Sequence, residues 1–346
     1  MTKRKIKTSL YLIAGLTFCL AVRAEAETVH DTLFRVYSKL TPRSVVSRSL
    51  AGSGSAMPHS DFQGFINPAL TMTGNGGRAG GAGTMAMGYG WDEVFDKVIL
   101  PFGMVFIDNN GAMGVYYSYL NGERSTVHDA MLNFSWEMFK QAEKPGSVDG
   151  GLNIRYERSK WRHRIEGGGV DDGENGEESP DRIVNVNASN LILDLGFYQR
   201  QILPGIDFAF VFTNLAGYRW NNTIDGGDKA SGWFGWRHCS MVAGMLYTFP
   251  MWGAIVRIPF DVEMTGLFSK ASPSSYIMRT GIEAQIAQIY SVRFGYARSP
   301  GSFADLIADF HYKNLYYGGV GINVRPVKFD FFIGTDEFGA TATYFY

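Results

Sequence analysis

Apolar and polar side chains alternate one by one along the last part of the chain. In residues 327–333 the charged side chains, Lys328 and Asp330, fall on one face of the segment. The other face carries Val327, Phe329, Phe331 and Ile333. The same alternation runs through 290–296, 318–324 and 338–346. A repeat of two residues is the period of a β-strand, so the pattern predicts a series of strands with one apolar face each.

The alternation continues upstream and predicts about fourteen strands, an even number, as bacterial single-chain barrels have. The expected strands are 84–90, 97–107, 111–120, 128–140, 149–164, 183–201, 205–220, 232–249, 253–267, 276–287, 289–298, 312–324, 327–335 and 338–346. Tight turns, such as 325–326, mostly alternate with longer loops, such as 299–311, although the connection at 141–148 is longer than a periplasmic turn should be. An aromatic residue ends the chain. These features predict an all-β fold: a transmembrane antiparallel β-barrel in a Gram-negative-type outer membrane.

The residues before 84 do not follow the strand pattern. Basic residues precede an apolar run, and small residues follow it, which is the pattern of a cleaved signal peptide that ends at Ala24 or Ala26. The next residues combine a short helical pattern with segments rich in glycine and serine. We expect a signal peptide at 1–24, an N-terminal plug inside the barrel at 27–83 and the barrel itself at 84–346.

Charge and cysteine content exclude several classes of protein. The chain has 32 Lys and Arg against 33 Asp and Glu, and loss of the signal peptide removes only basic residues, so we expect no nucleic-acid partner. Cys239 is the only cysteine after the signal peptide, so we predict no disulfide, no metal site and no cofactor. No later apolar run approaches the roughly 20 residues of a membrane helix. Composition leaves a secreted β-rich protein as the alternative to a barrel.

A motif in the predicted plug resembles a known family. It consists of Leu50, Gly52, Gly54, Asn67, Pro68 and Ala69. Small residues allow close backbone packing inside a lumen, and Asn-Pro favours a turn. The motif resembles the plug of the FadL-like outer-membrane barrels and, among them, is most similar to the PorV/PorQ group associated with type IX secretion. Further segments resemble the same family in order, at 191–198, 212–217, 279–284 and 292–296.

The resemblance implies two functions of different classes. A PorV/PorQ-type barrel acts in protein secretion or cell-surface assembly through its rim, with secretion-machinery or secreted proteins as partners. The alternative is a FadL-like channel that takes up hydrophobic small molecules through an opening in the wall. In both cases the wall contacts outer-membrane lipid and lipopolysaccharide.

The predicted strands offer some support for each function. A channel for hydrophobic molecules needs an apolar pocket and an interrupted strand, for which the candidates are 101–103 and a bulge near 187–191. Inward positions of the late strands are mostly charged or glycine, however, which makes a poor apolar pocket. We therefore favour the secretion role at this point.

Charged residues of the predicted strands fall on the face away from lipid, where a charge is least costly. This predicted lumen lattice consists of Arg155, Glu157, Arg257, Asp261, Glu263, Arg279, Glu283, Arg293, Lys328 and Asp330. Both signs occur on neighbouring strands. The mixture favours ion pairs that brace the wall and plug over a ring of one sign that selects ions.

Aromatic residues gather near the expected surface loops. They are Trp220, Trp233, Phe234, Trp236, Phe303 and Phe310. Two interpretations stay open for this predicted rim: an aromatic belt in the outer leaflet, or a contact surface for an apolar ligand or a secreted protein.

Two further interpretations concern chemistry. Acidic residues and glycines alternate in 167–178, which indicates a solvated loop or a calcium site of a kind other than an EF-hand. Three histidines lie near serine or aspartate in the sequence: His128 with Asp129 and Ser125, His238 with Ser240, and His311 with Asp309. None lies in a nucleophile motif such as Gly-x-Ser-x-Gly, so we predict no enzyme activity.

Overall fold

The computed structural model describes the chain in segments. They are residues 45–58, 63–76, 80–90, 98–107, 111–122, 125–139, 147–165, 182–224, 230–234, 239–265, 275–298, 314–334 and 337–345. The predicted signal peptide and the acidic loop at 167–178 lie outside these residues. Among the described residues, no helix has both the length and the apolar character needed to cross a membrane.

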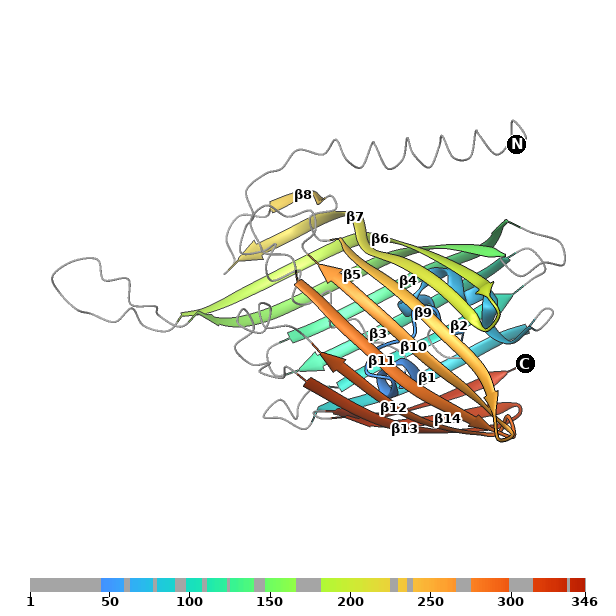
Figure 1. Ribbon diagram of the computed structural model, residues 1–346. Coiled ribbons are helices and arrows are strands. Elements are labelled where there is room, and N and C mark those ends of the chain that lie inside the picture. Colours follow the sequence, from blue (N-terminus) through green and yellow to red (C-terminus); the bar gives the residue numbers. More distant parts are fainter. Residues whose placement is uncertain are drawn as a thin grey trace, which may run out of the picture.

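Antiparallel strands make up most of the described chain (Figure 1). They are β1 (Gly80–Gly90), β2 (Val98–Ile107), β3 (Gly111–Gly122), β4 (Ser125–Phe139), β5 (Val148–Ile165), β6 (Arg182–Leu203), β7 (Ile206–Ile224), β8 (Ala230–Phe234), β9 (Ser240–Met251), β10 (Ala254–Thr265), β11 (Ser275–Ile286), β12 (Tyr290–Arg298), β13 (Asn314–Val324), β14 (Val327–Gly334) and β15 (Glu337–Phe345). Short helical segments precede them: α3 (Val45–Ser49), α4 (Gln63–Ile66) and η1 (Pro68–Gly76).

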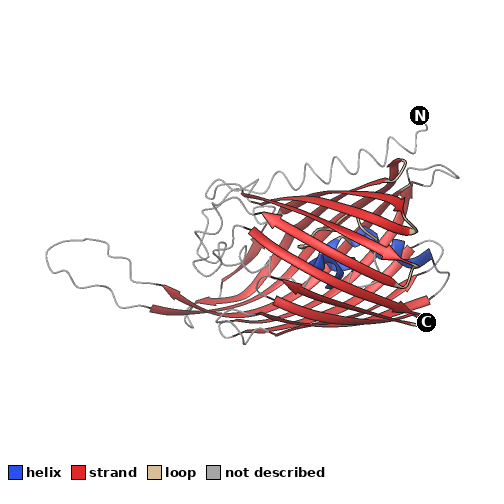
Figure 2. Cartoon of the chain, turned by 60° about the horizontal axis from the view of Figure 1, so that its bottom comes forward, coloured by secondary structure: helices blue, strands red, loops and turns tan. Residues whose placement is uncertain are grey.

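The strand pairings run around a barrel. Strands that follow one another in the sequence are neighbours, β1 pairs with β15, and β7 pairs with β6 on one side and β9 on the other. β8 stands apart from this circuit, because it pairs only with the later part of β7. Figure 2 shows the tilted strands of the resulting wall. The predicted all-β barrel of about fourteen strands is confirmed.

Two predicted boundaries need correction. The expected strand 232–249 is divided in the structure into β8 and β9, which pair in turn with the later and the earlier part of β7. The first wall strand begins at Gly80, so the predicted boundary between plug and barrel at 84 falls inside β1. Both regions are rich in glycine and small residues, whose side chains give only a weak alternation.

The two faces of the wall have opposite character. On β14, Phe329 and Phe331 are each 46% exposed, whereas Asp330 between them is fully buried. β12 repeats the arrangement, with exposed Val292 and Phe294 on either side of buried Arg293. A soluble sandwich buries its apolar face, so a sheet with its charges inside and its apolar face outside belongs in lipid. This excludes the alternative of a secreted β-rich protein.

The two ends of the barrel also differ. Tight turns join β6 to β7, β9 to β10, β11 to β12 and β13 to β14 at one end. The longest connections, those from β5 to β6, from β10 to β11 and from β12 to β13, lie at the other end, although two short ones, after β3 and after β14, lie there as well. Since outer-membrane barrels have short periplasmic turns and long surface loops, the end of the tight turns is the periplasmic one.

The outward position of Phe331 can be tested by a charge. We expect Phe331→Arg to lower the free energy of unfolding by about 2–4 kcal/mol, because it places a cation in the hydrocarbon layer. The same change at Val324, beside the turn between β13 and β14, should cost about 0–1 kcal/mol because that level is hydrated. Equilibrium unfolding in lipid vesicles, followed by tryptophan fluorescence, measures both costs. Equal costs at the two positions would contradict a lipid-facing wall.

Candidate functional site: a plugged lumen

The segments 45–58 and 63–76, here called the plug, lie inside the barrel (Figure 2). α3 lies against β12 to β15, and η1 lies against β3 to β6. Apolar side chains join the plug to the wall. They are Val46, Leu50, Ala56, Met57, Ala69 and Leu70 from the plug with Tyr198, Ala209 and Leu246 from the wall. The predicted plug residue Leu50 is thus fully buried between the two.

Asp261 of β10 holds the backbone of the plug. Its carboxylate accepts hydrogen bonds from the N–H groups of Gly54 and Ser55, each at 3.0 Å, and from the Ser55 hydroxyl at 2.8 Å. Gly52 and Gly54 adopt φ of 80° and 124°, a region that favours glycine. The two predicted plug glycines therefore shape the turn that presents these donors to the wall.

Asn67 connects the two parts of the plug to β6. Its side-chain amide donates to the carbonyls of Ser55 at 2.9 Å and Phe197 at 3.1 Å. Its side-chain oxygen accepts from the N–H of Ala69 at 3.0 Å, as in a turn. The motif residues Asn67 and Ala69 thus set the path of the chain where η1 begins at Pro68.

Two wall asparagines that sequence analysis missed support the same segment. Asn153 of β5 donates to the carbonyl of Gly64 at 2.7 Å, and Asn133 of β4 donates to that of Pro68 at 3.2 Å. The two side chains are also hydrogen-bonded to each other at 2.7 Å. They lie opposite one another on neighbouring strands, which a correct register could have revealed.

Inward-facing glycines let the plug approach the wall closely. A Cβ at any of them would overlap plug atoms: Gly151, Gly196, Gly244, Gly281, Gly295 and Gly319. At Gly151 the obstacle is the backbone of Pro68 and Ala69, which cannot rotate away as a flexible side chain could. These glycines of the inward face therefore form the surface on which the plug packs.

A first group of ion pairs crosses β10 to β14. Arg293 binds Glu283 at 2.6 Å and Asp330 at 2.9 Å, so it bridges strands on both sides. Further pairs join Arg257 to Glu283 at 2.6 Å, Lys328 to Asp330 at 3.0 Å and Arg279 to Glu263. All these residues belong to the predicted lumen lattice, and both signs alternate along the wall.

A second group lies on β4 to β7. Arg155 binds Asp194 at 2.6 Å, Asp129 at 3.3 Å and the side-chain oxygen of Asn214 at 2.8 Å. Glu157 accepts from Asn190 at 3.1 Å, which in turn accepts from Arg219 at 3.1 Å. Of this group, only Arg155 and Glu157 belong to the predicted lumen lattice. The partners on β6 and β7 were missed because the register of these strands shifts at three places.

The lumen also contains an apolar cluster, which sequence analysis did not expect. Its buried members are Ala51, Tyr116, Met131, Ala297, Tyr317 and Phe332, with Phe65, Val105 and Leu315 packed against them. Ala51 and Phe65 come from the plug, and the others come from β2 to β4 and β12 to β14. The late strands, whose inward positions we expected to be mostly charged or glycine, thus also contribute Ala297, Leu315, Tyr317 and Phe332 to this cluster.

The backbone ladder of the wall is interrupted at two prolines. In β2, Ile99 and Phe102 are paired through the backbone with residues of β1, whereas Leu100 and Pro101 between them are not. Between β10 and β11, the pairings are likewise absent at Ile258 and Pro259. Proline has no N–H to donate to a neighbouring strand. Of the candidate interruption at 101–103, only Pro101 lies in the gap, whereas Phe102 and Gly103 are paired with β1. The bulge predicted near 187–191 is confirmed by the register shift between Asn187 and Ser189.

The predicted rim is described only in part. Trp220 stacks on Tyr156 with ring centroids 5.7 Å apart, and Trp233 meets Tyr218 edge-on at 5.2 Å. These rings lie near the surface end of β5, β7 and β8. The side chain of Phe234 and the residues Trp236, Phe303 and Phe310 lie outside the described residues.

The histidine pairs give no catalytic arrangement in the described residues. The His128 ring is 2.7 Å from the Tyr117 hydroxyl, whereas Asp129 binds Arg155 inside the lumen. The two neighbouring side chains thus point to opposite faces of β4. His238 and the pair His311 and Asp309 lie outside the described residues.

The chain is similar in fold to solved outer-membrane channels. Against the CymD monoaromatic hydrocarbon channel the TM-score is 0.58 at 16% identity, over 88% of this chain and 97% of that chain. Against the toluene transporter TbuX of Ralstonia pickettii it is 0.56 at 12%, over 89% and 99%. Against a FadL homologue of Pseudomonas aeruginosa it is 0.57 at 11%, over 87% and 98%. No protein-family model and no curated protein matches the sequence.

These comparisons define the class of protein. The chain is an outer-membrane β-barrel with the fold of FadL-type channels, as the FadL-like part of the resemblance implied. The comparisons do not show the closer likeness to PorV/PorQ, and they give no support to the secretion role that we favoured from the sequence. That choice rested on the PorV/PorQ resemblance and on the scarcity of apolar inward positions in the late strands, whereas these strands contribute Ala297, Leu315, Tyr317 and Phe332 to an apolar cluster.

The hold of Asp261 on the plug can be tested by conductance. We expect Asp261→Ala to raise the single-channel conductance of the barrel in planar bilayers, because three plug donors lose their acceptor. Asp149→Ala is the matched control, since this buried wall aspartate binds Arg200 and not the plug. A closed channel in the Asp261 variant, or equal conductance in both variants, would speak against this anchoring.

The bridging role of Arg293 can be tested by stability. Arg293→Met should lower the free energy of unfolding by about 3–5 kcal/mol, because two buried carboxylates lose their shared cation. Lys328→Met should cost clearly less, since Asp330 then keeps Arg293. Urea unfolding in vesicles compares the two. If both variants lose the same stability, Arg293 has no special place in the network.

Proposed function

We propose that this protein is a channel for small hydrophobic molecules, with monoaromatic hydrocarbons as the substrate class. The observation that carries the proposal is the apolar cluster between plug and wall, in a barrel whose fold is similar to those of channels described for such molecules. An uncharged aromatic solute leaves water for an apolar lining because burial of apolar surface is favourable. The ion-paired parts of the lumen offer it no comparable site.

The path from the lumen leads through the wall between β1 and β2. The backbone ladder is interrupted there at Leu100 and Pro101, and Phe102 beside the gap is 55% exposed on the lipid side. Val105 and Tyr116 of the apolar cluster lie on β2 and β3, next to this seam. A hydrophobic molecule that crosses here enters lipid without passing through the polar floor of the barrel.

The second interruption is a natural comparison. The seam between β10 and β11 also lacks two backbone pairings, at Ile258 and Pro259. Its lumen side, however, carries the ion pairs of Arg279 with Glu263 and of Arg257 with Glu283. An apolar solute gains nothing by displacing buried ion pairs. The lining of the gap, together with the gap itself, therefore supports a path through the β1–β2 seam.

The plug controls entry to this path. Ala51 and Phe65 complete the apolar cluster from the plug side, and the Phe65 and Tyr116 rings lie 5.4 Å apart. A substrate reaches Tyr116 and Met131 when these plug residues yield space. Such a local shift leaves the hydrogen bonds at Asp261 in place, so the barrel passes a small apolar molecule while it excludes ions.

Repair of the seam tests the proposal. Pro101→Val supplies a backbone N–H toward β1, so we expect toluene uptake to fall several-fold in a strain that relies on this protein. Pro259→Val makes the same change in the β10–β11 seam and should leave uptake unchanged. Radiolabelled toluene uptake by whole cells measures both, and heat-modifiable gel migration checks that each variant folds.

The uptake measurements distinguish between a wrong path and a wrong function. Loss of uptake in the Pro101 variant alone supports passage between β1 and β2. Equal uptake in all three forms removes the seam from the path, and no uptake by the unaltered protein above that of a strain without it overturns the channel function.

A further inference from the structure

The outward face of β5 changes character along its length. Leu152 and Ile154 are followed at alternate positions by Tyr156, Arg158 and Lys160, the last three exposed. The series rises from the apolar band toward the surface end of the strand, because β5 begins at the periplasmic end. Aromatic residues mark the border of the hydrocarbon layer, so the two cations stand at the level of the lipid headgroups.

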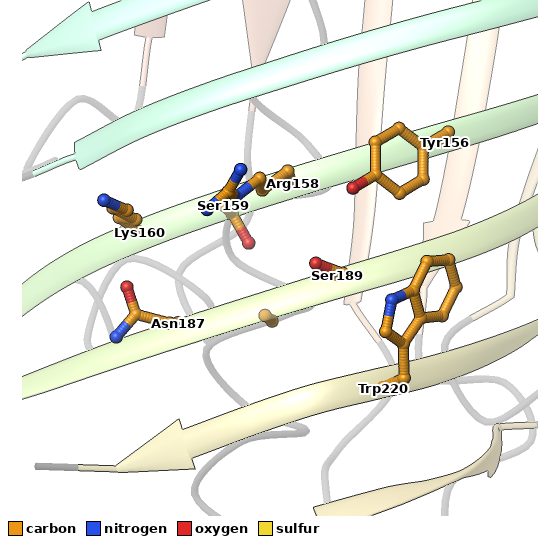
Figure 3. A pocket seen from close by; sticks show the side chains of 8 residues that line it. Tyr156, Arg158, Ser159, Lys160, Asn187, Ser189 and Trp220 are labelled. Carbon is orange, nitrogen blue, oxygen red and sulfur yellow. The ribbon is translucent and has the colours of Figure 1, made fainter. Parts of the chain in front are cut away.

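A hollow of about 360 Å³ lies at this level between β5, β6 and β7. Figure 3 shows the Tyr156 and Trp220 rings on one side of it and Arg158, Lys160, Asn187 and Ser189 on the other. The two rings are stacked, with an interplanar angle of 25°. The hollow thus combines a flat aromatic surface with two cationic groups and neutral polar side chains.

The two cations have no counter-ion in the part of the chain that the structure describes. Among the described residues, neither Arg158 nor Lys160 forms an ion pair, whereas cations inside the barrel such as Arg293 are paired. The residues opposite them on the neighbouring strands are neutral or basic. Arg158 faces His128 and Ser189, and Lys160 faces Thr126 and Asn187. Two such cations at one hollow favour a doubly charged anion such as a phosphate.

We propose that this hollow binds a phosphate group of a phosphorylated glycolipid of the outer leaflet. Arg158 and Lys160 hold the phosphate, and Tyr156 with Trp220 packs against the adjoining sugar, as amphipathic rings do at the membrane border. The acyl chains of the same molecule then lie along Leu152 and Ile154 below. The site faces away from the lumen and does not depend on the proposed channel function.

Native mass spectrometry of the detergent-purified, full-length barrel tests the site. The probe is hexa-acylated lipid A with two phosphates, and the same glycolipid without phosphates is the comparison. We expect the double variant Arg158→Gln, Lys160→Gln to bind the phosphorylated probe at least tenfold more weakly. Arg298→Gln is the matched control, since this exposed cation ends β12 beside the Tyr296 and Tyr316 ring pair and should leave binding unchanged.

Each remaining outcome decides the proposal. Equal weakening by Arg298→Gln means general attraction to surface charge and overturns it, as does equal binding of both glycolipids. The proposal is also overturned if millimolar inorganic phosphate displaces the phosphorylated glycolipid and Trp220→Leu binds that glycolipid as tightly as the unaltered protein does. The hollow is then a site for a free anion. Weaker binding in Trp220→Leu, with unaltered unfolding in urea, supports a lipid-bound phosphate.

Discussion

Backbone hydrogen bonding in lipid is the constraint on which this structure depends. A strand in hydrocarbon finds no water for its N–H and C=O groups, so it needs a partner strand on each side. The circuit from β1 through β7 and from β9 to β15 provides these partners. Because side chains alternate along each strand, the circuit divides them into a lipid set and a lumen set.

The lumen set then has a space to fill that is too wide for wall side chains alone. The chain fills it with its own N-terminal segment and with ion pairs. Glycines such as Gly151 let the plug backbone approach, while Asp261, Asn133 and Asn153 satisfy its polar groups. A buried polar group without a partner is costly, so the plug and the wall are matched group by group.

The same constraint makes the two prolines significant. Each removes a ladder hydrogen bond between two strands whose backbones pair on either side of the gap. One gap is backed by ion pairs and the other adjoins the apolar cluster, so equal backbone defects differ in what they can pass. What a gap in the backbone ladder can pass therefore depends on the side chains that line it on the lumen side as well as on the gap itself.

The sequence by itself determined the barrel, its orientation and the identity of many inward charges, because a repeat of two residues directly encodes which face a side chain takes. It also located the interruption at Pro101 and the motif around Asn67. Tertiary structure decided the rest. The partners of Arg155 depend on shifted register between β6 and β7, and the apolar cluster joins Phe65 of the plug to strands far apart in the chain. Such contacts follow from strand stagger and from the path of the plug, and neither leaves a periodic signal in the sequence.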